Sequence, residues 1–188
     1  MKRWLPLLLL AGCSGGSVAP AWQVNAKYSL DTFQQAYLRG DSRVADVEFA
    51  RAKSELASTG NVSLVARAEL VRCATRAASL EFDNCPEFEK LRADAGAEEV
   101  AYADFLAGRA ARAAADEPLS KLVEFGVQFK SATATPESVS AAVEIASAQG
   151  WRRPLLAWLG VQEKRAEAAG DSAALERIRR RIALTRGG

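Results

Sequence analysis

The sequence predicts an all-α protein built from antiparallel helical hairpins. From Asp31 onward the chain is rich in alanine, leucine, arginine and glutamate, which favour helices. Its apolar residues recur at helical spacing, and the short breaks between these stretches contain glycine, proline or capping residues. No segment alternates convincingly between apolar and polar residues, as a half-buried strand does.

About nine helices are expected, and the first two are joined by a tight turn. Asp31 and Gln34 have the spacing of a capping box, so we expect the first helix to begin at Asp31. Gly40 is expected to end it, because glycine adopts the left-handed conformation at helix ends. Asp41 or Ser42 caps the second helix.

The next helices follow from apolar periodicity. The second carries one apolar face and ends at Gly60-Asn61. That face consists of Ala45, Phe49, Ala52 and Leu56. The third helix repeats the periodicity from Leu64 to Ala78. A short fourth helix is expected from Pro86 to about Asp94, and a fifth over residues 97–113.

Proline marks three later helix starts. Pro118 opens one helix, and Thr135-Pro136-Glu137 opens the next with a capping hydroxyl and an acid in the first turn. Gly150 closes that helix, and Pro154 begins another. Gly170-Asp171-Ser172 then turns the chain into the last helix.

The tripeptide Gly-Asp-Ser occurs twice, at residues 40–42 and 170–172. This resembles the tetratricopeptide family, in which such turns join the paired helices of a repeat. Ala45, Phe49 and Ala52 match small and aromatic packing positions of that family, whereas Phe33 and Glu163 stand where a small residue is expected. The resemblance implies a degenerate helical-hairpin solenoid; an irregular helical bundle is the alternative.

The first residues have the pattern of a secretory leader. Met1-Lys2-Arg3 is basic, and the apolar stretch from Leu5 to Ala11 is far shorter than the ~20 residues that span a bilayer. Leu10-Ala11-Gly12-Cys13 resembles the lipobox of bacterial lipoproteins. The alternative is an ordinary secreted protein with a cysteine at this position.

The lipobox resemblance implies cleavage before Cys13 and lipid attachment to that residue. The chain then divides into a signal peptide (1–12), a lipidated cysteine with a flexible tether (13–30) and one helical domain (31–188). In families with this motif, an aspartate after the cysteine commonly retains the protein in the inner membrane. Ser14 stands there instead, so we expect the periplasmic face of the outer membrane.

The charge and histidine counts narrow the possible functions. The chain has 25 basic and 23 acidic residues, and the excess is Lys2 and Arg3 of the leader. A neutral mature chain argues against nucleic acid as a partner. The absence of histidine excludes a Ser-His-Asp or Cys-His catalytic machine and any histidine-ligated metal within this chain.

Cys73 and Cys85 are the two cysteines that remain after Cys13. In an oxidising compartment, an even pair favours a disulfide. Two free thiols or a redox pair is the alternative, although a spacing of twelve residues lacks the geometry of a C-x-x-C site.

No motif predicts a catalytic site, a cofactor or a metal site. An acidic cluster around Cys85 could bind Ca²⁺ but lacks the spacing of a known loop, so a solvated loop is favoured. The cluster is Glu81, Asp83, Asn84, Glu87 and Glu89. Glu98-Glu99 is interpreted as ordinary charge at a helix start.

Basic residues are concentrated at the C-terminal end. From Arg152 to Gly188 there are nine basic and four acidic residues, a net charge of +5. They form either a solvated helix face or a surface for anionic lipid, peptidoglycan or an acidic partner. The candidate binding residues are Arg152, Arg153, Arg177, Arg179, Arg180 and Arg181.

These observations favour a non-enzymatic lipoprotein, anchored in the membrane through Cys13, that binds envelope proteins as a scaffold, assembly or pilotin-type factor. One alternative is a cell-wall hydrolase or lyase that uses Glu98, Glu144 or Glu163 as a general acid, which requires a raised pKa. Another is a small-molecule binding module with an apolar pocket near Trp151 and Trp158. Core positions are favoured for both tryptophans.

Overall fold

The computed structural model describes residues 19–112 and 115–187. Within this part of the chain all regular structure is helical, which confirms the predicted fold class: nine α-helices and one short 3₁₀ helix. Their bounds are α1 (Ala21–Arg39), α2 (Ser42–Ala57), α3 (Val62–Ala77), α4 (Pro86–Glu89), η1 (Arg92–Asp94), α5 (Ala97–Leu106), α6 (Pro118–Lys130), α7 (Pro136–Ala148), α8 (Arg152–Ala169) and α9 (Ser172–Gly187). No helix in the described residues is long and apolar enough to cross a membrane.

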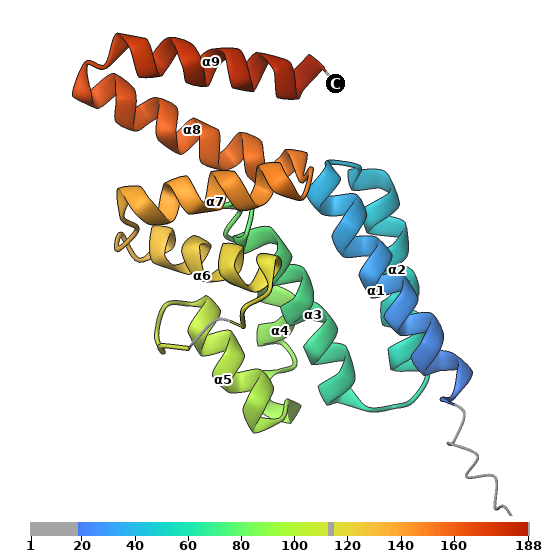
Figure 1. Cartoon of the computed structure of the whole chain (residues 1–188). Coiled ribbons are helices and arrows are strands. Elements are labelled where there is room, and N and C mark those ends of the chain that lie inside the picture. Colours follow the sequence, from blue (N-terminus) through green and yellow to red (C-terminus); the bar gives the residue numbers. More distant parts are fainter. Residues whose placement is uncertain (1–18, 113–114, 188) are drawn as a thin grey trace, which may run out of the picture.

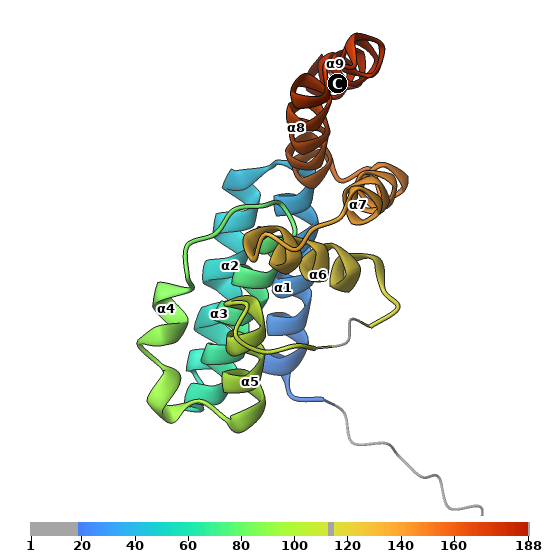
Figure 2. The ribbon, with the colours of Figure 1, turned by 90° about the vertical axis from the view of Figure 1, so that its left-hand side faces the viewer.

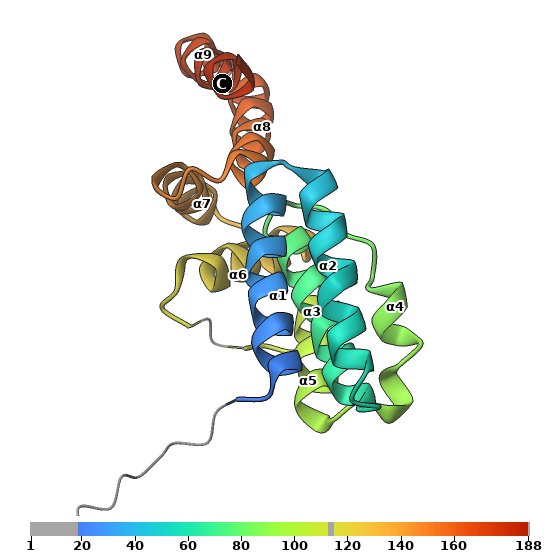
Figure 3. The same ribbon diagram turned by 90° about the vertical axis from the view of Figure 1, so that its right-hand side faces the viewer.

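Helix α3 is central to the body and packs against α1, α2, α4, α5 and α6. Figure 1 shows α1 and α2 side by side along one edge, with α3 next to them. The views from either side show that the α8–α9 hairpin extends beyond the body, at the end opposite to the start of α1 (Figures 2 and 3). Helix α8 attaches this hairpin to α7 and α1, and α9 packs on α8.

Both Gly-Asp-Ser turns have the same local structure. Gly40 and Gly170 adopt left-handed backbone conformations with φ of 94° and 67°. The following residues, Asp41 and Asp171, each donate their backbone N–H to a carbonyl five residues back, as in a Schellman motif. Each aspartate also caps the next helix, accepting a hydrogen bond from Val44 N or Ala174 N. The predicted turns between paired helices are therefore confirmed.

The first helix begins ten residues earlier than predicted. It starts at Ala21, so the predicted start at Asp31 and a flexible tether reaching residue 30 are wrong. Asp31 lies within the helix and pairs with Lys27 one turn away. The added turns are stabilised by burial of Ala26 against Leu56 and Ala68.

The fifth helix is shorter than predicted. Helix α5 ends at Leu106, whereas the alanine-rich sequence predicted a helix to residue 113. Gly108 has a φ of 77°, and Arg109 donates its N–H to the carbonyl of Asp104 and pairs with the Asp104 carboxylate at 2.7 Å. This closed turn ends the helix despite good helix-forming residues beyond it.

Most of the core lies between the C-terminal half of α3 and helices α4 to α8. Trp158, Phe88 and Leu122 are fully buried there. Gly126 of α6 packs so closely on the end of α3 that a Cβ would overlap the carbonyl oxygen of Ala77. This close approach requires glycine and positions α6 beside α3 and α5.

Candidate functional site

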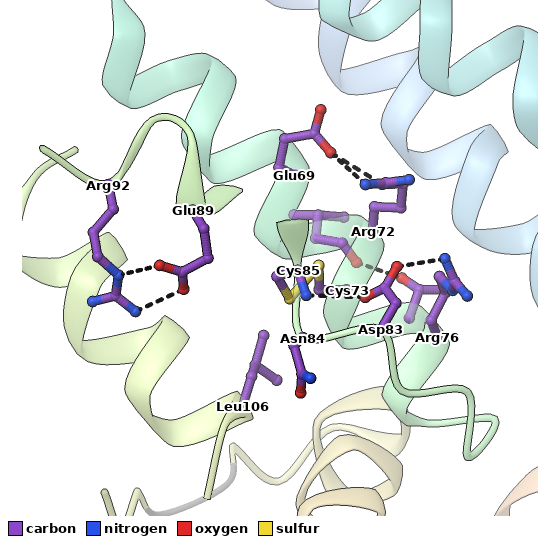
Figure 4. The surroundings of a disulfide bond; sticks show 12 residues. Glu69, Arg72, Cys73, Arg76, Asp83, Asn84, Cys85, Glu89, Arg92 and Leu106 are labelled. Carbon is purple, nitrogen blue, oxygen red and sulfur yellow. Dashed lines mark hydrogen bonds and ion pairs between the residues drawn. A yellow bond between two sulfur atoms is a disulfide. The ribbon is translucent and has the colours of Figure 1, made fainter. Parts of the chain in front are cut away.

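The predicted disulfide is present. Cys73 of α3 is joined to Cys85, which directly precedes α4, with the two Cα atoms 5.8 Å apart (Figure 4). Asp83 accepts a hydrogen bond from the backbone N–H of Cys85 at 3.0 Å and pairs with Arg76 of α3 at 2.6 Å. The covalent bond and this ion pair both fasten the 78–85 loop to α3.

Cys73, Asp83 and Cys85 are also near enough to one another to hold a metal ion. Their arrangement favours a structural role, because both sulfur atoms are in the disulfide and Arg76 neutralises the carboxylate. Cys13, the proposed lipidation residue, lies outside the described residues.

The acidic residues around Cys85 do not converge on one point. Each carboxylate pairs with a cationic side chain: Glu81 with Arg153, Asp83 with Arg76, Glu87 with Lys90, and Glu89 with Arg92. The side-chain oxygen of Asn84 accepts a hydrogen bond from Lys130. The pKa of Glu89 is lowered, chiefly by the hydrogen bond from Arg92. Arg76 also lies 3.8 Å from Glu81, so it pairs with two of these residues. The acidic side chains are thus engaged by cationic side chains, which favours a solvated loop over a calcium site.

The six candidate arginines occupy different environments. Arg153 contacts other parts of the protein rather than only solvent. Its guanidinium donates hydrogen bonds to the carbonyl of Tyr37 at 2.8 Å and to Ser42 Oγ at 2.6 Å. It also pairs with Glu81 at 3.3 Å. The same group lies 4.2 Å from the centre of the Tyr37 ring. Burial and the nearby Glu81 carboxylate raise the pKa of Tyr37, so this ring remains neutral. Arg153 therefore attaches α8 to the α1–α2 turn.

Arg179 is also engaged within the protein, because it pairs with Glu163 at 2.8 Å and Glu167 at 2.9 Å and so holds α9 on α8. Arg152 lies beside Gly40. Arg177, Arg180 and Arg181 are exposed on α9, whereas Ile182 is buried. With Leu184, which is 80% exposed, they form a continuous surface, the outer face of α9.

None of the three glutamates considered as general acids has a carboxyl group that is both buried and unpaired. Glu98 is 91% exposed, Glu144 is exposed on α7, and Glu163 pairs with Arg179. Trp151 and Trp158 are core residues, as favoured from the sequence: both are buried, and Trp158 packs edge-on against Phe129.

An open groove of about 500 Å³ lies between α3, α5 and the start of α6, and we call it the α3–α5 groove. Its volume falls within the range of small-molecule sites. Its apolar lining consists of Leu70, Val71, Tyr102, Phe105 and Val123. Arg67, Glu98, Glu99 and Arg112 supply its charged groups.

Two interactions hold the charged groups of the α3–α5 groove in place. Arg67 donates from Nε at 2.8 Å and from Nη2 at 2.6 Å to Oε1 of Glu99, a carboxylate that is only 6% exposed. Hydrogen bonding from Arg67 lowers the pKa of Glu99, which keeps this carboxylate ionised. Arg112 lies 4.9 Å from the centre of the Tyr102 ring.

Sequence reasoning did not identify this groove. Arg67 and Glu99 are 32 residues apart, and no local pattern indicates that they meet. Glu98-Glu99 was interpreted as ordinary charge at a helix start, which fits Glu98 but not the buried Glu99.

No protein-family model, curated protein or solved structure matches this chain.

Proposed function

We propose that this protein is a non-enzymatic lipoprotein at the periplasmic face of the outer membrane, where it binds another envelope protein. The leader and the lipobox-like Leu10-Ala11-Gly12-Cys13 support the anchor. The observation that carries the binding role is the outer face of α9, which no other described helix covers. The role is that of a scaffold, assembly or pilotin-type accessory factor.

The outer face of α9 fits an acidic protein surface. Arg177, Arg180 and Arg181 lie one to two turns before Leu184 on α9, so the face joins positive charge to one exposed apolar side chain. Arg180 is partly compensated by Glu176 at 3.6 Å, whereas Arg177 and Arg181 form no ion pair with any described residue. Arginines around an apolar anchor are typical of protein interfaces.

The position of α9 favours a protein partner over the lipids of the anchoring membrane. The start of α1, where the helical body begins, lies at the opposite end of the molecule from the α8–α9 hairpin (Figure 1). The eight residue steps from Cys13 to Ala21 span at most about 28 Å, and α1 alone is about 28 Å long. An anchored body that stands away from the membrane presents α9 toward the periplasm.

A photo-crosslinker in place of Leu184 tests the binding role in intact cells that produce the protein. We expect a discrete crosslinked product whose yield falls at least fivefold when Arg177→Glu and Arg181→Glu are added. The matched control is Arg39→Glu with Arg43→Glu, which changes two exposed arginines near the α1–α2 turn. No discrete product, or equal loss with the control pair, would contradict the binding role.

The anchor has a separate test. Cys13→Ala is expected to abolish metabolic labelling with an alkyne fatty acid and to move the protein from the membrane fraction to the soluble periplasmic fraction. Cys73→Ala with Cys85→Ala is the control and is expected to leave labelling unchanged. Labelling that persists in Cys13→Ala would refute lipidation at this residue.

A further inference from the structure

We propose that the α3–α5 groove binds a single-chain amphiphile with one anionic head group, of the medium-chain fatty-acid type. This inference concerns different helices from the outer face of α9 and does not depend on the proposed protein-binding role. Three features of the groove support it: one uncompensated guanidinium, an apolar lining, and mainly helical walls that offer a peptide few backbone partners.

Arg112 is the group that selects an anion. Arg67 is compensated, because Glu99 binds it directly and Glu98 lies 3.9 Å from it. Arg112 forms no ion pair with any residue that the structure describes, and its contact with Tyr102 positions the guanidinium while leaving its N–H donors available. A guanidinium of this kind binds a carboxylate in a bidentate manner.

The apolar lining fits one short chain. Leu70, Phe105 and Val123 lie in the wall of the groove, and each is nearly buried. The lining residues of α5 run from Glu98 to Phe105, and the seven steps between these two residues span about 10 Å along a helix. A single medium-chain tail covers this length, and its burial is favourable at about 0.8 kcal/mol per CH₂.

The walls disfavour an extended peptide as the occupant. A peptide carries one donor and one acceptor at almost every residue, and these need partners when they are buried. Most of the groove wall is formed by α3, α5 and α6, and only Arg112 and Ala115 come from the loop between α5 and α6. Backbone groups within the helices are bonded to their own helix. The first-turn amides of α6 at Leu119 and Ser120 are already bonded to the Glu117 carboxylate at 3.0 and 2.9 Å. An alkyl chain has no such requirement.

Isothermal titration with decanoate tests the proposal. The full chain carrying Cys13→Ala is used, so that acylation at that residue does not compete. We expect saturable 1:1 binding below the micelle-forming concentration and at least tenfold weaker binding to Arg112→Gln, since a hydrogen-bonded charge pair contributes about 1.5–3 kcal/mol. Arg112→Lys is expected to recover part of the affinity, and Arg43→Gln, which removes a distant exposed arginine, to change nothing.

Two further ligands identify what the groove recognises. Decan-1-ol keeps the chain and lacks the charge, and N-acetyl-trileucine keeps the carboxylate but carries a peptide backbone. Both are expected to bind at least tenfold more weakly than decanoate. Absence of decanoate binding, equal affinity for Arg112→Gln, or tighter binding of either comparison ligand would each overturn the proposal.

Discussion

The indole nitrogen of Trp158 donates a hydrogen bond to the carbonyl oxygen of Ala78, 3.0 Å away. Both residues are fully buried, and 80 residues of sequence separate them. Ala78 follows the last residue of α3, where helix carbonyls lack partners within their own helix. The contact therefore gives a partner to a buried carbonyl at the end of α3 and joins the C-terminal hairpin to this central helix.

Trp158→Phe removes this hydrogen bond while retaining an aromatic ring. We expect the free energy of unfolding to fall by about 2–4 kcal/mol, because a buried carbonyl loses its partner and the smaller ring leaves a cavity. Urea denaturation measures the change. Trp22→Phe, at a half-buried position in α1, is the control and is expected to cost less than about 1 kcal/mol.

Gly126→Ala is expected to destabilise the protein although alanine is the better helix former. The new methyl group overlaps the carbonyl of Ala77, so α6 must move away from α3 at a cost of at least about 2 kcal/mol. Gly160→Ala in α8 is the matched control, because nothing lies within 4 Å of its new Cβ. That substitution is expected to stabilise by about 0.5–1 kcal/mol. Equal thermal unfolding midpoints for the two variants would contradict the α3–α6 contact.

Arg153→Ala tests whether this residue attaches the hairpin or serves as a surface charge. Loss of its contacts with Tyr37, Ser42 and Glu81 is expected to cost about 2 kcal/mol and to increase hydrogen exchange at the start of α8. Arg177→Ala, on the outer face of α9, is expected to change stability by less than about 0.5 kcal/mol. Equal effects of the two substitutions would contradict a structural role for Arg153.

The fold was predictable where local chemistry determines it. Thr135 caps α7 through Ser138 N as its sequence indicated, and both Gly-Asp-Ser segments form turns. The start of α1 was missed because its buried positions include Ala26 and Ser29, small residues that give a weak periodic signal. The end of α5 was missed because a turn at Gly108 overrides the helix preference of the alanines that follow.

Site residues were less predictable than helices. The Cys73–Cys85 disulfide followed from counting cysteines, but the roles of the arginines depend on tertiary partners. Nothing in the sequence indicates that Arg153 and Arg177 differ. In the structure, however, Arg153 bonds to α1 and Arg177 is exposed. Likewise, Glu98 and Glu99 are neighbours that differ because successive helix positions point in different directions.

Cys73→Ser with Cys85→Ser is expected to lower the free energy of unfolding by about 3 kcal/mol, the chain-entropy value for a loop closed at a separation of twelve residues. Urea denaturation of the variant and of the reduced wild-type protein should agree. Wild-type protein that is equally stable in its oxidised and reduced forms would show that the Asp83–Arg76 ion pair holds the loop without help from the disulfide.

Glu99 is expected to make stability depend on pH in the acid range. Its pKa is lowered in the folded state by Arg67, so its contribution is fully present above the ordinary glutamate pKa of 4.5 and is lost as pH falls through the lowered value. Glu99→Gln should therefore be less stable than wild type by about 1 kcal/mol at pH 7, and the difference should shrink toward about pH 3. Urea denaturation across this range measures it. Glu98→Gln, at the neighbouring exposed position, is the control and is expected to follow the wild-type pH profile. If the loss of stability in Glu99→Gln does not change with pH, packing rather than the charge is responsible for it.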